Sequence, residues 1–274
     1  TRRSSDLSGI DPDFLEVAAN DYYIADSRLS SRPTQIKNLY VWNDEIYPRT
    51  YYVWTLPYKA IFYANNVLDG LGKISYSPTE VDAYNNLKGA ALFYRARMFY
   101  QLAQVFAQPY KQETAYSDLG IPLRLTADIN EKIVRSSVYE PYQRILTDLK
   151  LAIPLLPSAI VYKTKPSKPA AYAMVAKTYL AMRDYENALL YADSCLSLYN
   201  KVMDYNMIPN TSAPPFSQFN DEVIFHSVLT NNSLILSPTN TSLIDTNLYN
   251  SYDENDLRKT LFFRPPTSTG ITFK

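Results

Sequence analysis

The clearest pattern of apolar and polar positions lies in residues 169–199, where apolar side chains recur at helical spacing in two consecutive runs. Pro169 fits the opening turn of the first run, because the N–H that proline lacks would be unpaired there. Asp184 fits the N-cap of the second, and Arg183 and Asp184 leave room only for a tight turn. We therefore expect a helical hairpin. Its packed stripes would be Ala171, Val175, Thr178, Tyr179 and Met182, then Tyr185, Ala188, Leu189, Ala192, Cys195, Leu196 and Tyr199.

Small residues would let the two helices of this hairpin approach closely. Ala176 lies on the first helix, Ala188 and Ala192 lie on the second, and Tyr179 supplies bulk between them. This arrangement is similar to one unit of a tetratricopeptide repeat. A single unit cannot bury its own apolar face, so the pattern predicts that further helices stack on it.

Two helices are expected in the first third of the chain. One runs from Asp11 or Pro12 to about Ala25, and the other ends at Gly70 and Gly72. The second has Trp54, Tyr58, Ile61, Asn65 and Leu68 on one face. A polar side chain on an inward face needs hydrogen-bond partners, so Asn65 is expected to tie two helices together rather than contact a ligand.

The next helix has strong start and stop signals. Residues 77–80 (SPTE) form a capping box with proline at the first helical position, and Pro109 ends the run. Arg95 and Arg97 lie within this long helix, and we expect them to anchor neighbouring loops or carboxylates.

A further helix is capped by Ser137 through Glu140 and closed by Pro157, after a polar connector over residues 110–135. Beyond residue 200 prolines break the chain, and residues 222–225 (EVIF) predict a short strand.

Residues 38–50 (NLYVWNDEIYPRT) mix aromatic and charged side chains without a period, and with residues 26–33 they are expected to form loops. Loops positioned by a rigid scaffold often carry function. Trp42 and Tyr47 are candidates for stacking on a ligand, and Asn43 and Arg49 for hydrogen bonding to it. The alternative is that Trp42 belongs to the core.

Composition narrows the classes of function. A chain of 274 residues with 46% hydrophobic residues can bury a substantial core. Lys and Arg number 27, as do Asp and Glu, so there is no electrostatic case for a nucleic-acid or anionic-membrane surface. No apolar run is long enough to span a membrane. The single cysteine, Cys195, is expected to be a small buried hydrophobe.

Signatures of catalysis are absent from the sequence. His226 has no companions at metal-ligand spacing, and no glycine-rich phosphate loop or nucleophile elbow is present. We therefore expect no catalytic residues, no metal and no cofactor. A pair of carboxylates for glycoside hydrolysis leaves no short signature, which keeps an enzyme as a third alternative.

The order of these segments resembles the SusD/RagB family of glycan-binding outer-membrane lipoproteins. Four blocks carry the resemblance: Trp54, Tyr58, Ile61 and Asn65; residues 88–96 (KGAALFYRA) followed by Tyr100, Leu102, Phe106 and Pro109; residues 135–138 (RSSV) followed by Tyr142, Ile145, Asp148, Leu149, Ala152, Leu156 and Pro157; and Lys168, Ala170, Ala171, Ala176, Tyr179, Tyr185 and Ala188. The tail is similar too, in residues 220–225 (NDEVIF) and 256–258 (DLR). Ala90 and Ala107 depart from the family pattern, which has Glu and Gly there.

The resemblance implies a mostly α fold, a superhelical scaffold of tetratricopeptide-like hairpins with irregular loops and a few short strands near the C-terminus. Residues 1–200 would form the helical domain and residues 201–274 the start of an irregular portion, because family members run further and this chain is expected to be a truncated member.

The implied function is non-catalytic binding of a glycan at the surface of a Gram-negative bacterium, with delivery to a TonB-dependent SusC-like outer-membrane transporter. The membrane would be reached only through an N-terminal lipid anchor that is not in this chain. The alternative is a helical-repeat scaffold that binds a protein partner and no glycan.

Overall fold

The computed structural model describes residue 11 and residues 13–45, 52–210, 214–229, 242–268 and 270–274. The chain divides into two compact units whose segments alternate in the sequence. Unit 1 comprises Thr1–Asp11, Tyr52–Lys201 and Val223–Val228, and unit 2 comprises Pro12–Tyr51, Val202–Glu222 and Leu229–Lys274. The domain division that the sequence suggests near residue 200 stays a prediction.

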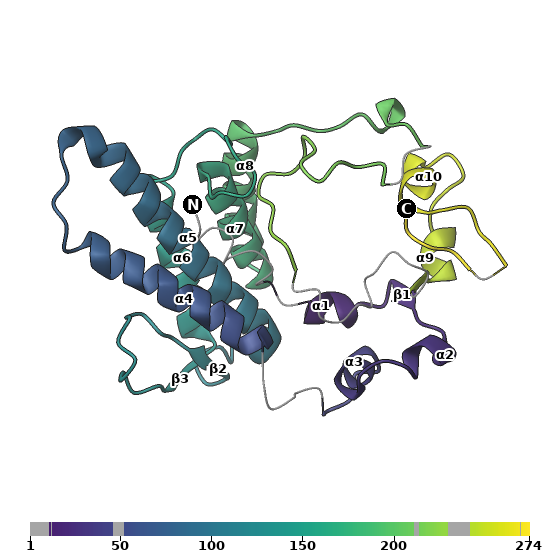
Figure 1. Ribbon diagram of the computed structural model, residues 1–274, viewed down its shortest axis with the longest axis horizontal. Coiled ribbons are helices and arrows are strands. Elements are labelled where there is room, and N and C mark those ends of the chain that lie inside the picture. Colours follow the sequence, from purple (N-terminus) through teal and green to yellow (C-terminus); the bar gives the residue numbers. More distant parts are fainter. Residues whose placement is uncertain (1–10, 12, 46–51, 211–213, 230–241, 269) are drawn as a thin grey trace. The chain divides into compact units, whose positions relative to one another are not determined.

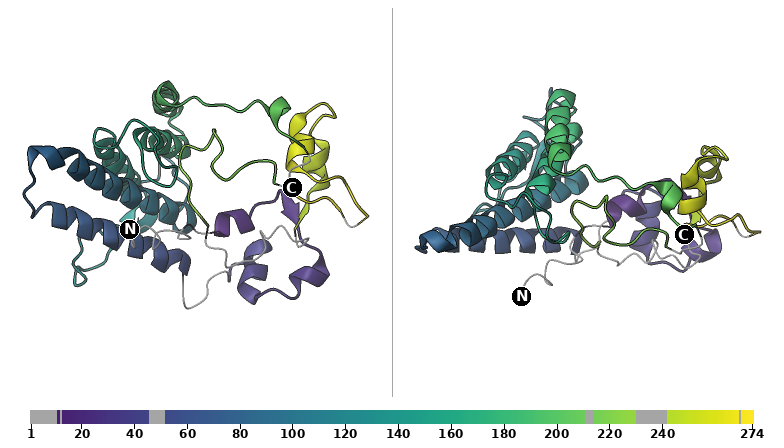
Figure 2. Two further views of the ribbon diagram at one scale, coloured as in Figure 1. Left: turned by 45° about the horizontal axis from the view of Figure 1, so that its top comes forward. Right: turned by 90° about the horizontal axis from the view of Figure 1, so that it is seen from above.

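Unit 1 is a stack of helices, which confirms the mostly α scaffold. Its helices are α4 (Tyr52–Leu71), α5 (Val81–Phe106), α6 (Tyr139–Ala152), α7 (Lys168–Ala181) and α8 (Tyr185–Leu198). Each helix packs on the next one along the chain. Figure 1 shows α4 and α5 running side by side, and both views of Figure 2 show the same pair.

The helix starts follow the polar signals of the sequence. Ser77 and Glu80 form the expected capping box before the short 3-10 helix η2 (Pro78–Glu80), which leads directly into α5. Ser167 accepts a hydrogen bond from the Ala170 N–H at the start of α7, and Asp184 accepts one from the Asn187 N–H at the start of α8. These side chains satisfy donors that the first turn of a helix leaves unpaired.

The centre of unit 1 is α5, whose Phe93, Met98, Phe99 and Leu102 are fully buried. The expectation for α8 was only half right. Ala188 and Cys195 are buried against the stack, but Tyr185, Leu189 and Leu196, on the neighbouring side of the helix, are exposed by 66%, 63% and 53%. The reason is geometric: α8 is the last helix of the series and packs mainly on α7.

A two-stranded sheet forms within and just after the polar connector expected over residues 110–135. Strand β2 (Leu119–Pro122) pairs antiparallel with β3 (Arg135–Ser137). The strands approach closely at Gly120, where a β-carbon would lie 2.2 Å from the Ser137 carbonyl oxygen. Glycine therefore makes this pairing possible.

Unit 2 consists of short elements. They are α1 (Phe14–Val17), β1 (Tyr22–Tyr23), α2 (Asp26–Leu29), α3 (Thr34–Tyr40), the 3-10 helix η3 (Tyr205–Met207), β4 (Leu243–Ile244), α9 (Thr246–Asn250) and α10 (Leu257–Phe262). The expected helix over residues 11–25 was wrong beyond Val17, because Tyr22 pairs with Ile244 of β4 and its hydroxyl donates to the Val17 carbonyl. Residues 26–33 and 38–40, which we expected in loops, contain α2 and the end of α3.

The strand expected at residues 222–225 was also wrong, since this stretch has no regular structure. Its apolar side chains nonetheless pack on the core of unit 1, as Ile224 and Phe225 are both partly buried against it. The Phe225 ring meets the Phe93 ring edge to face, with centroids 5.1 Å apart. The apolar signal in the sequence thus reflects burial, not strand pairing.

Candidate functional site

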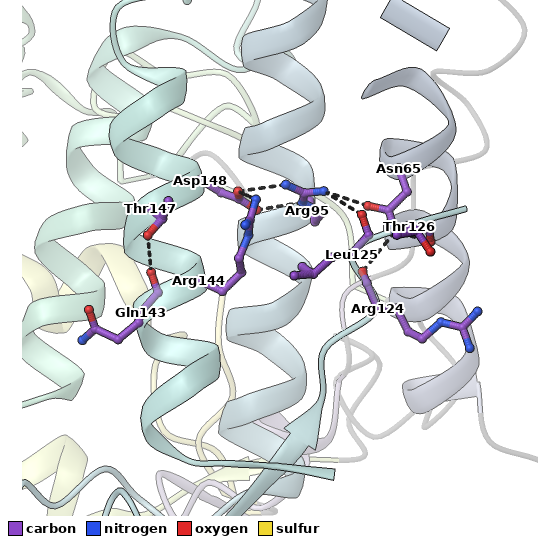
Figure 3. Close-up of polar contacts among 9 residues, drawn as sticks. All are labelled: Asn65, Arg95, Arg124, Leu125, Thr126, Gln143, Arg144, Thr147 and Asp148. Atoms are coloured by element: carbon purple, nitrogen blue, oxygen red, sulfur yellow. Dashed lines mark hydrogen bonds and ion pairs between the residues drawn. The ribbon is translucent and has the colours of Figure 1, made fainter. Parts of the chain in front are cut away.

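The polar residues of the helical motifs meet inside unit 1 (Figure 3). Arg95 on α5 donates through Nε and Nη2 to the Asp148 carboxylate on α6, at 2.8 and 2.9 Å. Its Nη1 donates to the Asn65 carboxamide oxygen on α4 at 2.9 Å. Arg144, one turn before Asp148, donates to the same carboxylate. Side chains from three helices therefore share one network, which we call the Arg95 network.

The Arg95 network holds a loop as well as the helices. Asn65 donates through Nδ2 to the carbonyl oxygens of Arg124 and Thr126, at 3.0 and 2.9 Å. Asn65 and Asp148 are completely buried, and Arg95 is 4% exposed. These residues cannot reach a ligand from solution. The structural role expected for Asn65 and Arg95 is confirmed, and the most recognisable polar residues of the motifs are not the binding site.

Arg97 has a similar anchoring role at another place on α5. Both terminal nitrogens of its guanidinium donate to the Asp11 carboxylate, and Nη2 also donates to the Ser227 hydroxyl. The guanidinium carbon lies 5.4 Å from the centre of the Phe225 ring, within cation–π range. Arg97 thus fixes two segments that are distant in the sequence, as its predicted role requires.

Trp42, in unit 2, is placed very differently. Its side chain is 75% exposed, so the alternative that it belongs to the core is wrong for this chain. Its backbone has φ of 56°, in the left-handed region that non-glycine residues rarely adopt. Asn43 N–H donates to the Asn38 carbonyl and Trp42 N–H donates to the Leu39 carbonyl. These two bonds define a Schellman motif that ends α3, with Trp42 where glycine is usual.

The neighbours of Trp42 are held by local hydrogen bonds. Asn43 accepts the Glu45 N–H through its side-chain oxygen at 2.9 Å, and the Asn38 side chain donates to the Glu45 carbonyl at 2.7 Å. The Tyr40 hydroxyl accepts the Ile24 N–H at 3.0 Å, which gives Tyr40 a structural role. The turn therefore presents a bulky indole from a hydrogen-bonded backbone.

Two candidate residues, Tyr47 and Arg49, lie outside the described residues, in the stretch 46–51. The structure thus places Trp42 and Asn43 next to each other at the end of α3 and leaves the other half of the proposed set untested. Unit 1 also has two stacked tyrosine pairs, Tyr76 with Tyr84 and Tyr116 with Tyr139, which have no recognisable sequence signal because the stacking depends on how the backbone folds.

In the described ranges, no three or more His, Cys, Asp or Glu side chains are grouped so that they could hold a metal ion. None of the helices described has both the length and the apolar character that crossing a membrane requires.

Comparison with known proteins identifies the family. The family model described as "Starch-binding associating with outer membrane" (SusD-like) matches residues 14–180. The SusD-like protein P2 of Formosa agariphila is 27% identical over 165 residues, which cover 60% of this chain and 30% of that protein.

Solved structures have the same fold. A putative sugar binding protein from Bacteroides vulgatus superposes with a TM-score of 0.79 at 22% identity, over 98% of this chain and 64% of that one. A laminarin binding SusD-like protein superposes with a TM-score of 0.56 at 20% identity, over 73% of this chain and 42% of that one. The chain therefore spans less than two thirds of the length of these relatives.

Proposed function

The chain belongs to the SusD-like family of starch-binding proteins that associate with the outer membrane, and on this premise we propose that it binds a glycan at the cell surface without catalysis. The family match over residues 14–180 carries the proposal. The similarity in fold to a laminarin binding protein supports a polysaccharide or its oligosaccharides as the ligand class.

The indole of Trp42 is the proposed stacking platform. The apolar face of a sugar ring packs on an aromatic face, while nearby polar groups bond its hydroxyls. Asn43 would supply hydrogen bonds from the same turn, and Tyr47 and Arg49 complete the proposed set. The left-handed backbone at Trp42 supports this choice, because strain of about 1–2 kcal/mol at an exposed residue brings no packing gain and fits a role in function.

Tryptophan fluorescence tests this platform directly. The chain has 2 Trp, and Trp54 packs between the rings of Tyr58 and Phe106, each with its centroid 4.8 Å away. In a Trp54→Phe background, Trp42 is the single reporter. Laminari-oligosaccharides and malto-oligosaccharides are titrated separately, and binding over Trp42 should change its emission.

Substitutions at Trp42 separate binding from folding. Trp42→Ala should weaken glycan binding at least about tenfold, as truncation of a central aromatic contact does, and Trp42→Tyr, which keeps a ring, should retain most of it. Trp42→Gly should lose binding and yet be no less stable to urea, because glycine relieves the left-handed strain. Unchanged affinity in Trp42→Ala would remove Trp42 from the site. Release of reducing sugar by the pure protein would contradict the non-catalytic role.

Delivery of the glycan to a TonB-dependent SusC-like transporter is the second part of the proposal, with attachment to the outer membrane through an N-terminal lipid anchor. Family membership supports it. Purification of the anchored protein from outer membranes should bring the transporter with it. Recovery of the protein alone under mild detergent would count against a stable partnership.

One observation favours the alternative of a protein-interaction scaffold. The exposed apolar stripe of α8, formed by Tyr185, Leu189 and Leu196, is the kind of surface that contacts another protein. A partner that is lost on Leu189→Glu, in a protein with no affinity for any glycan tested, would favour the scaffold over the glycan-binding function.

A further inference from the structure

A second exposed aromatic surface lies in unit 1. The rings of Tyr116 and Tyr139 are stacked, with centroids 4.2 Å apart and planes inclined by 25°. Tyr139 is the first residue of α6 and is partly buried, whereas Tyr116 is 68% exposed. One face of the Tyr116 ring is covered by Tyr139, so the exposed area belongs largely to its edges and opposite face.

The backbone that carries Tyr116 is fixed by hydrogen bonds on both sides. Ala115 N–H donates to the Lys111 carbonyl at 2.8 Å, and Asp118 N–H donates to the Thr114 carbonyl at 2.8 Å. The turn is also bonded to the start of α6, because Tyr139 N–H donates to the Ala115 carbonyl at 2.9 Å. The preceding side chain, Ala115, is fully buried. The ring is thus held in place before any ligand arrives, which lowers the entropic cost of binding.

The interaction with the Tyr139 side chain raises the pKa of Tyr116, and the phenol stays neutral at physiological pH. Because Tyr139 covers one face of the Tyr116 ring, the opposite face is the surface that remains for stacking on a ligand. Polar side chains of the same turn, Gln112, Glu113 and Ser117, are exposed and can bond hydroxyl groups of a ligand.

We propose that Tyr116, backed by Tyr139, is a second glycan-binding platform that stacks on the apolar face of a neutral pyranose ring. This inference rests on the proposed function and adds to it a contact in unit 1, whereas Trp42 belongs to unit 2. A fixed aromatic plane bordered by polar groups suits a sugar, which has an apolar face and a polar rim. Uncharged hexose oligomers are the ligand class, in keeping with the starch-binding family and the laminarin binding neighbour.

A second stacked pair in unit 1 provides a matched control. The rings of Tyr76 and Tyr84 have centroids 4.0 Å apart and planes inclined by 28°. Tyr76 is less exposed than Tyr116, at 46%, and its neighbour Tyr84 is tied to α4 by a hydrogen bond to the Leu71 carbonyl. If stacked exposed tyrosines bind sugar without regard to their setting, Tyr76→Ala should weaken binding as much as Tyr116→Ala.

The test is calorimetric titration of laminarihexaose and of maltohexaose into the wild-type protein and its variants. Tyr116→Ala should weaken binding of at least one glycan about five- to tenfold, the range expected for loss of one aromatic contact. Tyr116→Phe should stay within about twofold of wild type, because the ring remains. Tyr76→Ala should match wild type. The urea midpoint of Tyr116→Ala should be close to that of wild type because the side chain is exposed.

The outcomes separate this inference from the function on which it rests. Binding that is lost in Trp42→Ala and unchanged in Tyr116→Ala overturns the second platform and leaves the proposed function intact. Binding that weakens equally in Tyr116→Ala and Tyr76→Ala also overturns it. A wild-type protein that binds neither laminarihexaose nor maltohexaose, nor any other neutral oligosaccharide of a panel, overturns both.

Discussion

Substitution of Asp148 is the most demanding test of the packing described for unit 1. Asp148 is fully buried and its carboxylate accepts hydrogen bonds from Arg95 and from Arg144. Asp148→Asn keeps the shape of the side chain but removes the charge. One acceptor oxygen becomes an NH2 group, which then faces guanidinium donors.

The expected loss follows from these contacts. Each hydrogen bond to a charged group contributes about 1.5–3 kcal/mol, and removal of one partner from a buried ion pair typically costs about 3–5 kcal/mol. The Arg95 side chain is only 5% exposed and cannot recover its solvation, whereas Arg144, at 27%, can partly do so. We expect Asp148→Asn to lower the free energy of unfolding by about 3–5 kcal/mol. This is a large share of the roughly 5–15 kcal/mol that stabilises a typical domain.

Urea unfolding followed by far-ultraviolet circular dichroism measures this loss. Glu131→Gln is the control, because the Arg124–Glu131 pair is longer, at 3.9 Å, and its carboxylate side chain is 36% exposed. The control should lose no more than about 1 kcal/mol. The double variant Arg95→Met with Asp148→Leu should lose less unfolding free energy than the single variants Arg95→Met and Asp148→Leu lose together. In the double variant neither Arg95 nor Asp148 remains as a buried charge without the other. A loss in Asp148→Asn no larger than in the control would refute the reasoning.

Three further predictions concern a close contact, a titrating group and a helix cap. Gly120→Ala should lower the free energy of unfolding by about 1–3 kcal/mol because the new methyl group meets the Ser137 carbonyl. Gly70→Ala is the control and should cause no such loss, because the space around Gly70 is open. The midpoints of urea unfolding of the two variants and the wild type measure the difference. Burial raises the pKa of Tyr100 to about 12. As the pH rises above 10, Tyr100 ionises in the unfolded chain before it ionises in the folded protein, so the free energy of unfolding falls between pH 10 and 12. The Tyr100→Phe variant should show a smaller fall over that pH range. Asp184→Ala removes the N-cap of α8 and should lower the thermal midpoint through a loss of about 1 kcal/mol; an unchanged midpoint would contradict the capping role.

The helical scaffold was predictable because its signals are local. The capping box at residues 77–80, the cap at Asp184 and the spacing around Asn65 all lie within a few turns of the structure that they specify. Even the structural role of Asn65 could be inferred, since a polar residue on an inward face needs partners. The identities of those partners, Arg95 and two loop carbonyls, depend on how helices pack and have no local signature.

The short elements of unit 2 were not predictable for the opposite reason. Strand β1 exists because Tyr22 pairs with Ile244, more than two hundred positions along the chain, and this pairing overrides the helical spacing of residues 11–25. The candidate site shows the same limit. An aromatic residue in an aperiodic stretch looks identical in sequence whether it is buried or exposed, so only the structure shows that Trp42 is exposed and not part of the core.

The contacts of Arg97 constrain the order in which this chain can fold. The helices of unit 1 are complete once α8 has been synthesised, but the buried guanidinium bonds residues 86 and 130 positions away in opposite directions along the chain. Closing loops of this size is slow relative to pairing neighbouring helices. Asp11 precedes the helical stack in the sequence and Ser227 follows it. When the chain folds, the helices of unit 1 can therefore pair first, and we expect the return of residues 223–228 to α5 to be a late step.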